Sequence, residues 1–458
     1  MAVSLGSATV RLADFALGLK FGDLPPEVVD RTKALFLDFL GVAFGGRLAE
    51  SAGPVLRAVG RLRAGQPGEA TVVGEREGYP PHYAALLNGA FAHSQDFDDT
   101  HREGIIHPGA PIFAALLALA EAGGRPGWEF IAAAAAGYEV SCRLARAHGE
   151  RVHGRGFHPT ATTGIFGATA AGARLLGLGR EGLLNAWGLN LSQAAGSLQF
   201  LANGAWNKRV HTGLAAHNAL VALALAEAGV VGAADPFTGR FGYYYSYAGE
   251  GCELDSALSD LGQHYEVMRT AVKPYPCCRY NHAVIDGCLA IASAEDFEAG
   301  QIEAVEIELP PAAVPIVAEP EALKKAPANV VDAQFSVYFA AAVALTEGRF
   351  GWDSYGRLGE AGLRELMGRM RARGSGGVSE MGARVGVRTR GGRTRSVEVK
   401  LPRGEPEAFP TWEELVGKVR PLALGSLDGG RVDRLIEKVK ALEKVGDLRE
   451  LTALLRPG

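Results

Sequence analysis

The chain contains 458 residues, of which 47% are hydrophobic and 21% charged, and its formal net charge at pH 7 is −4. This composition is typical of a globular protein and excludes a fibrous or disordered chain, while the length predicts more than one domain. The near balance of charge gives no reason to expect a nucleic-acid or membrane partner.

The cysteines and the N-terminal segment favour a cytoplasmic protein. None of the five cysteines shows the C-x-x-C spacing of zinc, redox or iron–sulfur sites. Arg11 and Asp14 interrupt the first apolar stretch, which therefore lacks the uncharged core of a secretion signal. Other apolar runs, such as FIAAAAAGYEV, are shorter than the roughly 18 residues that a membrane helix needs, so we expect them to be buried helices.

Helical periodicity dominates residues 1–265. Stretches such as PEVVDRTKALFLDFLGVAF and WEFIAAAAAGYEVSCRLARA carry apolar residues three and four positions apart, which predicts helices. The many alanines and glycines of this region allow neighbouring helices to approach closely. We therefore expect a large all-helical domain.

Residues 266–404 follow a different pattern. QIEAVEIELP and ARVGVRTRGGRTRSVEVKLP alternate apolar and polar residues, as half-buried strands do, and Gly391 and Gly392 indicate a hairpin turn. RARGSGGVSEMG, residues 371–382, predicts an exposed loop. A smaller α+β domain is therefore expected here.

Helical periodicity returns over residues 405–458, with Pro410 and Thr411 at a predicted helix start. This last segment is expected to rejoin the first domain. The predicted fold class is thus mainly α with an α+β insertion, in which a large all-helical domain accompanies a smaller α+β lid domain.

Two His-Pro pairs each open a small, apolar, helix-like run, HPGAPIFAALLALAE from His107 and HPTATTGIFGATAAGARLLGL from His158. Proline is favoured at the first helical position, and the amide donors exposed at that end of a helix attract anions. Each imidazole is therefore predicted to lie beside a helix N-terminus suited to a carboxylate. Thr160, Thr162 and Thr163 add hydroxyl groups to the second of these helices.

An acidic loop precedes the first of these helices, HSQDFDDTHREGIIHPG over residues 93–109. Asp98, Asp99 and Thr100 are predicted to shape a polar pocket, while His107 donates or accepts a proton, since imidazole titrates near neutrality. Two alternatives remain open: the acidic residues cap helices, or their oxygens hold Mg²⁺ or another divalent ion.

The segment NGAWNKRVHTGLAAHNA, residues 203–219, offers the cations that an anion-binding pocket needs. It contains Lys208, Arg209, His211 and His217. A helix N-terminus contributes only about 0.3–1 kcal/mol to binding an exposed anion, so further positive charge is required. A solvated helix start is the alternative interpretation.

A second basic segment, AVKPYPCCRYNHAVID over residues 271–286, lies where the helical pattern gives way to the α+β pattern. Its prolines forbid a helix, so Lys273 is expected on an extended stretch, with Arg279 and His282 leading into the next helix. Cations at a predicted domain junction suggest a ligand cleft, although a linker with basic side chains fits equally well.

Together these segments resemble the MmgE/PrpD family along nearly the whole chain. The matching stretches, in the order of that family, are LLNGAFAHSQDFDDTH, HPGAPIFAALLALAE, GFHPTATTGIFGATAAGARLLGL, KPYPCCRYNHAVIDGCLAI and AQFSVYFAAAVALTEG. The resemblance implies a helical domain built from both chain ends, an inserted α+β domain and a homodimer. It also implies a pocket formed by Asp98, Thr100, His107, His158, Lys208 and Lys273.

The family includes 2-methylcitrate dehydratases, cis-aconitate decarboxylases and iminodisuccinate epimerases. The lack of suitably spaced cysteines argues against an iron–sulfur centre, and the expected reaction needs no cofactor and no metal. The form KPYPCCRYNH after the lysine is more like the broad MmgE-type branch than the methylcitrate dehydratases. We hypothesise that Arg279 and His282 contact a substrate carboxylate specific to that branch.

These residues suit chemistry at a carbon beside a carboxylate. Negative charge that develops there needs preorganised positive charge, which Lys208, Lys273 and the helix N-termini would supply. His107 and His158 are predicted to act as the acid and the base, without an assignment of which is which.

We therefore predict a cofactor-independent lyase that acts on a small di- or tricarboxylate, with 2-methylcitrate dehydratase-like loss of water as the leading reaction. Decarboxylation or epimerisation of a related substrate, such as cis-aconitate or iminodisuccinate, is the alternative. Two others are a metal-dependent all-α hydrolase that uses Asp96, Asp98 and Asp99, and a helical scaffold without activity.

Overall fold

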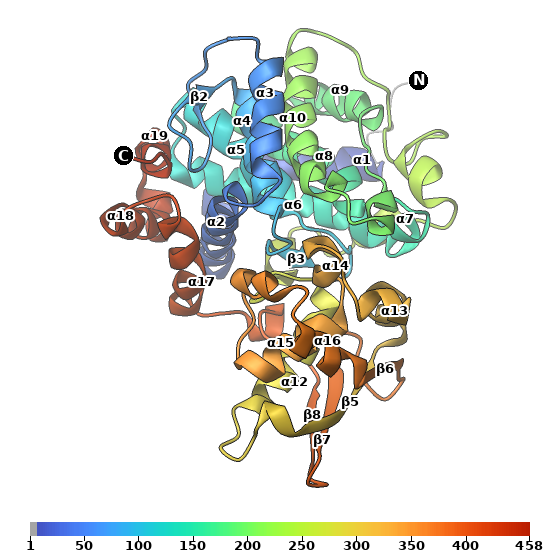
Figure 1. Ribbon diagram of the computed structural model, residues 1–458. Coiled ribbons are helices and arrows are strands. Elements are labelled where there is room, and N and C mark those ends of the chain that lie inside the picture. The colour runs from blue at the N-terminus through green and yellow to red at the C-terminus, as the bar shows by residue number, and fades with distance from the viewer. Residues whose placement is uncertain (1–6) are drawn as a thin grey trace. The chain divides into compact units, whose positions relative to one another are not determined.

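The computed structural model describes residues 7–458, which form two compact units (Figure 1). The first contains the chain up to Phe200 together with Trp206–Val272 and Thr411–Gly458, and the second contains Leu201–Ala205 and Lys273–Pro410. The first unit is helical and the second holds the main sheet, which confirms the predicted fold class. Within the described range, no helix combines the length and apolar character that crossing a bilayer requires.

The first unit consists of helices joined by short loops and two small strand pairs. Its helices are α1 (Ala8–Gly18), α2 (Pro26–Arg47), α3 (Ala52–Leu62), α4 (Pro81–His93), α5 (Gly109–Gly123), α6 (Gly127–His148), α7 (Arg151–Gly154), α8 (Pro159–Leu176), α9 (Arg180–Leu191), α10 (Asn207–Glu227), α11 (Leu254–Ala257), α17 (Trp412–Leu424), α18 (Gly429–Lys440) and α19 (Arg449–Thr452). Strands β1 (Ala70–Thr71) and β2 (Gly78–Tyr79) pair antiparallel, as do β3 (Thr100–His101) and β4 (Thr270–Ala271).

Helices α4 and α10 approach each other closely at two glycines. A Cβ atom at Gly89 would lie 2.8 Å from the Cα atom of Gly213, and one at Gly213 would lie 2.1 Å from the carbonyl oxygen of Leu86. Only glycine leaves room for this contact. The close approach matters for function because it fixes the end of α4, at His93, relative to the first turn of α10, where Lys208 lies.

The C-terminal helices α17, α18 and α19 belong to the first unit. Thr411 caps α17 as expected, because its side chain accepts the backbone N–H of Glu414 and the Glu414 carboxylate accepts that of Thr411. Helix α17 packs against α2, and a buried ion pair joins Lys418 Nζ to Asp38 Oδ1 at 2.5 Å.

The second unit is built on a mixed four-stranded sheet in the order β6-β5-β7-β8. Its strands are β5 (Ile302–Leu309), β6 (Met370–Gly374), β7 (Ala383–Thr389) and β8 (Thr394–Val399), and its helices are α12 (His282–Ala292), α13 (Glu321–Lys324), α14 (Val330–Gln334), α15 (Val337–Glu347) and α16 (Ala361–Gly368). Helix α12 packs on β7 and β8, and α15 packs on α12. The alternating residues of β5 and β7 point their apolar side chains into this core.

The sheet confirms one sequence prediction and corrects another. The predicted hairpin joins β7 and β8, and Gly392 adopts a positive φ of 77° in the turn. The predicted exposed loop over residues 371–382 is wrong at its start, because residues up to Gly374 belong to β6, which pairs parallel to β5. The strand is short and runs into the glycine-rich stretch that indicated a loop. Its arginines lie on an edge strand, where charged side chains hinder pairing with other chains.

Candidate active site

Five segments of the first unit bring imidazole, carboxylate and ammonium groups together. His93 ends α4, Asp96 and Asp98 follow it, His107 precedes α5, His158 precedes α8, and α10 carries Lys208 and His211 in its first turns. The ring centroids of His93 and His107 are 4.8 Å apart, and those of His93 and His158 are 5.5 Å apart. The predicted pair His107 and His158 has a centroid distance of 6.5 Å, so the structure brings both imidazoles to one place.

Asp98 lies between two of these rings. Its Oδ2 atom is 2.7 Å from Nδ1 of His93, and its Oδ1 atom is 3.4 Å from Nδ1 of His107. Burial opposes ionisation of Asp98, but the two imidazoles outweigh it and hold the pKa of the carboxyl well below its usual range. Asp98 therefore orients the rings of His93 and His107. Its direct contact with a substrate, which the sequence indicated, remains a prediction.

His158 and His211 form a second pair, with their Nδ1 atoms 3.1 Å apart. Because two acceptors repel, one Nδ1 atom carries a proton and donates it to the other. Burial, followed by the neighbouring His93 and Lys208, lowers the pKa of His211 to about 4 and that of His158 well below its usual value. Burial also lowers the pKa of His93 to about 4, against the opposing effect of Asp98.

These shifts bear on the predicted role of His158 as an acid or a base. At neutral pH the rings of His93, His158 and His211 are uncharged. Neutral imidazoles accept protons or donate N–H hydrogen bonds, but they do not supply positive charge.

The positive charge of this cluster comes from Lys208. Its Nζ atom is 2.5 Å from Oδ1 of Asp96, and the same carboxylate oxygen is 3.9 Å from Nε2 of His107. Asp96 adopts a left-handed backbone conformation with φ of 51°, which aspartate tolerates better than most residues. The sequence indicated Asp98 as the substrate-binding acid of this loop, whereas the contact between Asp96 and Lys208 was not predicted.

Part of the polar loop serves the ends of helices, which was the alternative interpretation. Asp99 Oδ1 accepts the backbone N–H of Gly109 at 3.0 Å, and the Tyr138 hydroxyl donates to Oδ2 at 2.5 Å. Burial is the main cause that raises the pKa of Asp99 to about 8. Asp99 therefore caps α5, while Thr100 lies half-buried on β3.

In the first turn of α8, the side chains likewise form hydrogen bonds to the backbone. His158 is the residue before the helix and Pro159 its first residue, as predicted, whereas α5 begins one residue after Pro108. The Thr160 hydroxyl accepts the backbone N–H of His107 at 3.1 Å. Thr162 and Thr163 donate to the Pro159 carbonyl, so their predicted role at an anion site is not supported by these contacts.

The other residues predicted from the two basic segments are described by their own contacts. Lys273, Arg279 and His282 are part of the second unit. There Arg279 donates from Nε to Glu405 Oε1 at 2.8 Å, and its Nη1 atom lies 2.8 Å from Nδ1 of His282. His217 packs against His82, with ring centroids 5.3 Å apart, and is not part of the histidine cluster.

One group in this cluster has the composition of a metal site. Ligand atoms of His93, Asp98 and His107 all lie within 4.8 Å of one another. Neutral imidazole nitrogens and a carboxylate oxygen are ligands that Zn²⁺ and related ions accept. These three residues are therefore the place where the metal-dependent alternative would have its ion.

Comparisons with known proteins give a consistent result. Residues 10–253 match the MmgE/PrpD N-terminal domain, and residues 275–444 match the MmgE/PrpD C-terminal domain. A cis-aconitate decarboxylase-like protein of Aspergillus oryzae is 26% identical, over 98% of this chain and 97% of its own. The cis-aconitate decarboxylase of Aspergillus terreus is 26% identical over 98% of this chain and 95% of its own, and that of Homo sapiens is 27% identical over 99% and 95%.

Proposed function

Because this chain belongs to the MmgE/PrpD family, we propose that it is a cofactor-independent lyase acting on a small di- or tricarboxylate. The observation that supports the proposal best is the cluster of the first unit, where one ammonium group and several neutral imidazoles share a buried site. The ammonium group of Lys208 attracts a carboxylate of the substrate, and the imidazoles exchange protons with carbon or oxygen.

Decarboxylation, dehydration and epimerisation all place negative charge on a carbon beside a carboxylate. In decarboxylation the C–C bond breaks, CO₂ leaves, and its bonding electrons remain on carbon until a proton is delivered. In dehydration a base takes the α-proton, and an acid donates a proton to the leaving hydroxyl, which departs as water. Fixed cations near the carboxylate stabilise both transition states, and a positioned acid or base completes each reaction.

Decarboxylation of a tricarboxylate such as cis-aconitate is the first candidate reaction, because the three relatives carry the name cis-aconitate decarboxylase or a related one. Loss of water, as in 2-methylcitrate dehydratase, is the second. It is favoured by the presence of several imidazoles in one cluster, since dehydration needs both a base and an acid.

Four other residues enter the proposal as predictions. We propose that Lys273 supplies a second ammonium group, and that Thr100, Arg279 and His282 contact carboxylate or hydroxyl groups of the substrate. The contacts of Arg279 with Glu405 and His282 already hold its guanidinium group in a fixed orientation. A substitution of Lys273 by Ala tests the first of these roles directly.

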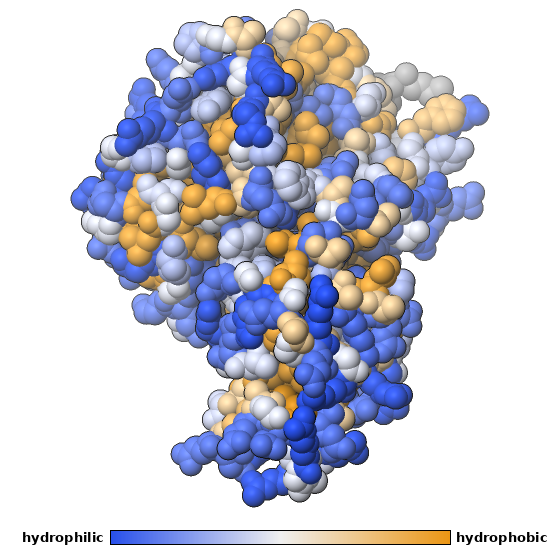
Figure 2. Space-filling view, viewed as in Figure 1, coloured by the Kyte–Doolittle hydropathy of each residue, from blue (hydrophilic) through white to orange (hydrophobic). Residues whose placement is uncertain are grey.

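We propose further that the protein is a cytoplasmic homodimer. The five cysteines form no disulfide, which is compatible with a reducing compartment. Leu214 and Leu225, three turns apart on α10, are 44% and 39% exposed. Figure 2 shows hydrophobic colouring in the region of α10, and an exposed apolar helix face of this kind suits contact with a second copy.

The proposed function is tested by incubating the protein with citrate, methylcitrate, cis-aconitate and iminodisuccinate, and following each by NMR and mass spectrometry. Loss of CO₂ identifies a decarboxylase, loss of water a hydro-lyase, and inversion at carbon an epimerase. No change in any of these compounds would contradict the proposal. Activity that disappears with EDTA and returns with a divalent ion would instead establish the metal-dependent alternative.

A further inference from the structure

The loop that leads to His107 contains an unfavourable backbone conformation. Among residues 7–458, four residues other than glycine have a positive φ: Ala64, Asp96, Ile105 and Asp235. Ile105 has φ of 54° and lies two residues before His107. A β-branched side chain in the left-handed region is a genuine outlier, and such strain persists only where the surroundings impose it.

Backbone hydrogen bonds close this loop tightly. The N–H of His101 donates to the Ile106 carbonyl at 2.8 Å, and the N–H of Ile106 donates back to the His101 carbonyl at 3.3 Å. Between them, the N–H of Ile105 donates to the Arg102 carbonyl at 3.2 Å. The left-handed turn at Ile105 is what allows Ile106 to reach His101, so the loop cannot relax at Ile105 and keep this pairing.

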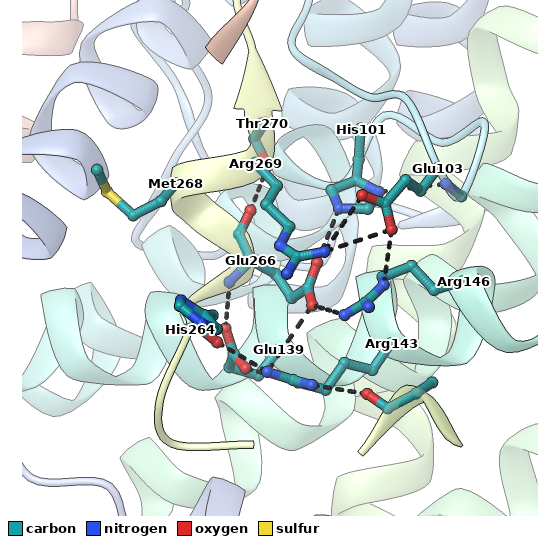
Figure 3. A network of polar contacts seen from close by, with 12 residues as sticks. His101, Glu103, Glu139, Arg143, Arg146, His264, Glu266, Met268, Arg269 and Thr270 are labelled. Atoms are coloured by element: carbon teal, nitrogen blue, oxygen red, sulfur yellow. Dashed lines mark hydrogen bonds and ion pairs between the residues drawn. The ribbon is translucent and has the colours of Figure 1, made fainter. Parts of the chain in front are cut away.

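A buried polar network holds the other side of the loop (Figure 3). The N–H of Gly104 donates to Nδ1 of His101, so the neutral ring carries its proton on Nε2, which donates to Glu266 Oε2 at 2.8 Å. His101 and Glu266 are 1% and 0% exposed. Removing one partner of such a pair leaves a buried group without its hydrogen bond.

Glu266 is itself fixed by two further groups. Its Oε1 atom accepts from Nη1 of Arg146 at 2.5 Å, and its backbone N–H donates to Glu139. Arg143, fully buried, donates to Glu139 from Nε at 2.8 Å. In Figure 3 these side chains converge on Glu266 from α6. His101 is thus attached to a rigid helix and, by β-pairing with Thr270, to β4.

We propose that His101 and Ile105 are positioning residues for His107: the His101–Glu266 contact holds the loop 101–106 in its strained form, and that form sets the His107 ring against Asp98. The Nδ1 atom of His107 is 3.4 Å from Asp98 Oδ1, and its backbone N–H is held by Thr160. The kinetic part of this inference rests on the proposed function of His107, whereas the structural part does not.

The first test compares Ile105→Pro with Ala64→Pro. Proline fixes φ at about −65°, so each substitution forbids the left-handed conformation, and each also removes a backbone N–H that donates to the carbonyl three residues earlier. Ala64 is exposed at the end of α3 and belongs to no part of the site. Ile105→Pro is expected to lower kcat about tenfold to a hundredfold, with KM changed less than about twofold, while the protein stays folded. Ala64→Pro is expected to leave kcat unchanged. Wild-type kcat in Ile105→Pro would overturn the inference.

A measurement without substrate separates this inference from the proposed function. In ¹⁵N-histidine NMR spectra, Ile105→Pro is expected to shift the ring signals of His107, and Ala64→Pro is not. If the signals shift and no carboxylate is converted by the wild type, the proposed function fails and the positioning role stands. Unshifted signals would overturn the positioning role whatever the activity.

The second test addresses the contact between His101 and Glu266. His101→Leu removes the donor to the Glu266 carboxylate, whereas His101→Gln keeps an N–H that can donate. We expect kcat to fall in His101→Leu and to recover in part in His101→Gln. Equal and wild-type kcat in both would contradict the role of His101. If His101→Leu does not fold, the comparison of Ile105→Pro with Ala64→Pro decides alone.

Discussion

The imidazole rings of His93, His158 and His211 share a buried environment that favours their neutral form. A neutral ring can take a proton from carbon or oxygen, which a ring already protonated cannot do. The cluster therefore combines neutral bases with one fixed cation, Lys208, beside the carboxylate of Asp96. This combination suits an anionic substrate that gains negative charge during the reaction.

Substitution of His211 by Asn tests the shifted pKa. The unfolded imidazole titrates near pH 6.5, but the folded ring stays neutral until about pH 4. Below pH 6.5 the unfolded state binds a proton that the folded state does not, so the wild type loses free energy of unfolding relative to His211→Asn as pH falls toward 4. The slope is up to about 1.4 kcal/mol per pH unit. Denaturant titrations across this range measure it, and a constant difference would contradict the shift.

Substitution of Lys208 by Met tests the cation. The variant removes the ammonium group next to Asp96 and leaves a carboxylate that repels an anionic substrate. We expect kcat/KM to fall about 10²- to 10³-fold. Steady-state kinetics on the substrate found in the NMR screen measure this effect, and circular dichroism checks the fold. A folded variant with the kcat/KM of the wild type would show that Lys208 takes no part in the reaction.

The residues of the site were predicted unevenly. His107, His158 and Lys208 were found because His-Pro pairs and a basic helix start are visible in the sequence, and the structure brings these three to the same cluster. The contact of Asp96 with Lys208 depends on a left-handed backbone, and the contact of His158 with His211 depends on helix packing. Neither is encoded in local spacing, so neither could be read from the sequence.

At the scale of elements, two helices from opposite ends of the chain share a buried charge pair. Lys418 of α17 and Asp38 of α2 have side chains that are 9% and 1% exposed. Burial raises the pKa of Asp38 to about 6, although Lys418 opposes this effect. The ion pair therefore connects α17, in the C-terminal segment, to α2, the second helix of the chain.

Substitution of Lys418 by Met leaves the Asp38 carboxylate buried without its ammonium partner. We expect a loss of about 3–5 kcal/mol in the free energy of unfolding. Lys438→Met is the matched control, because Lys438 pairs with the exposed Glu450 and keeps 32% of its own side chain exposed. Its loss is expected to cost less than about 1 kcal/mol. Equal losses in the two variants would show that the pair between α2 and α17 is not important for stability.

At the scale of the whole molecule, the fold class was predictable because the spacing of apolar residues differs along the sequence. They recur every three or four residues in helical segments and at every second residue in strands. The helical period covers both ends of the chain, and the strand period marks β5, β7 and β8. Strand β6 was not predicted, because its five residues are too few to establish an alternation and run directly into the glycine-rich stretch that indicated a loop. The order of strands was equally hidden, because a central β5 with one parallel and one antiparallel neighbour follows from tertiary packing.

The proposed homodimer is a property of this scale. The double substitution Leu214→Glu and Leu225→Glu places charges on the exposed face of α10 and is expected to give a monomer. Light scattering after size-exclusion chromatography would then report 48.1 kDa for the variant and about twice that mass for the wild type. A monomeric wild type would contradict the dimer, and a dimeric variant would exclude this face.

The decisive measurement is the kcat/KM of His107→Gln on the carboxylate that the wild type converts, beside His217→Gln as control. Both rings lie in the helical unit, but only His107 contacts Asp98, whereas His217 packs on His82. We predict a fall of about 10²- to 10³-fold for His107→Gln and no change for His217→Gln. Wild-type kcat/KM in a folded His107→Gln protein would show that the reaction takes place without this cluster.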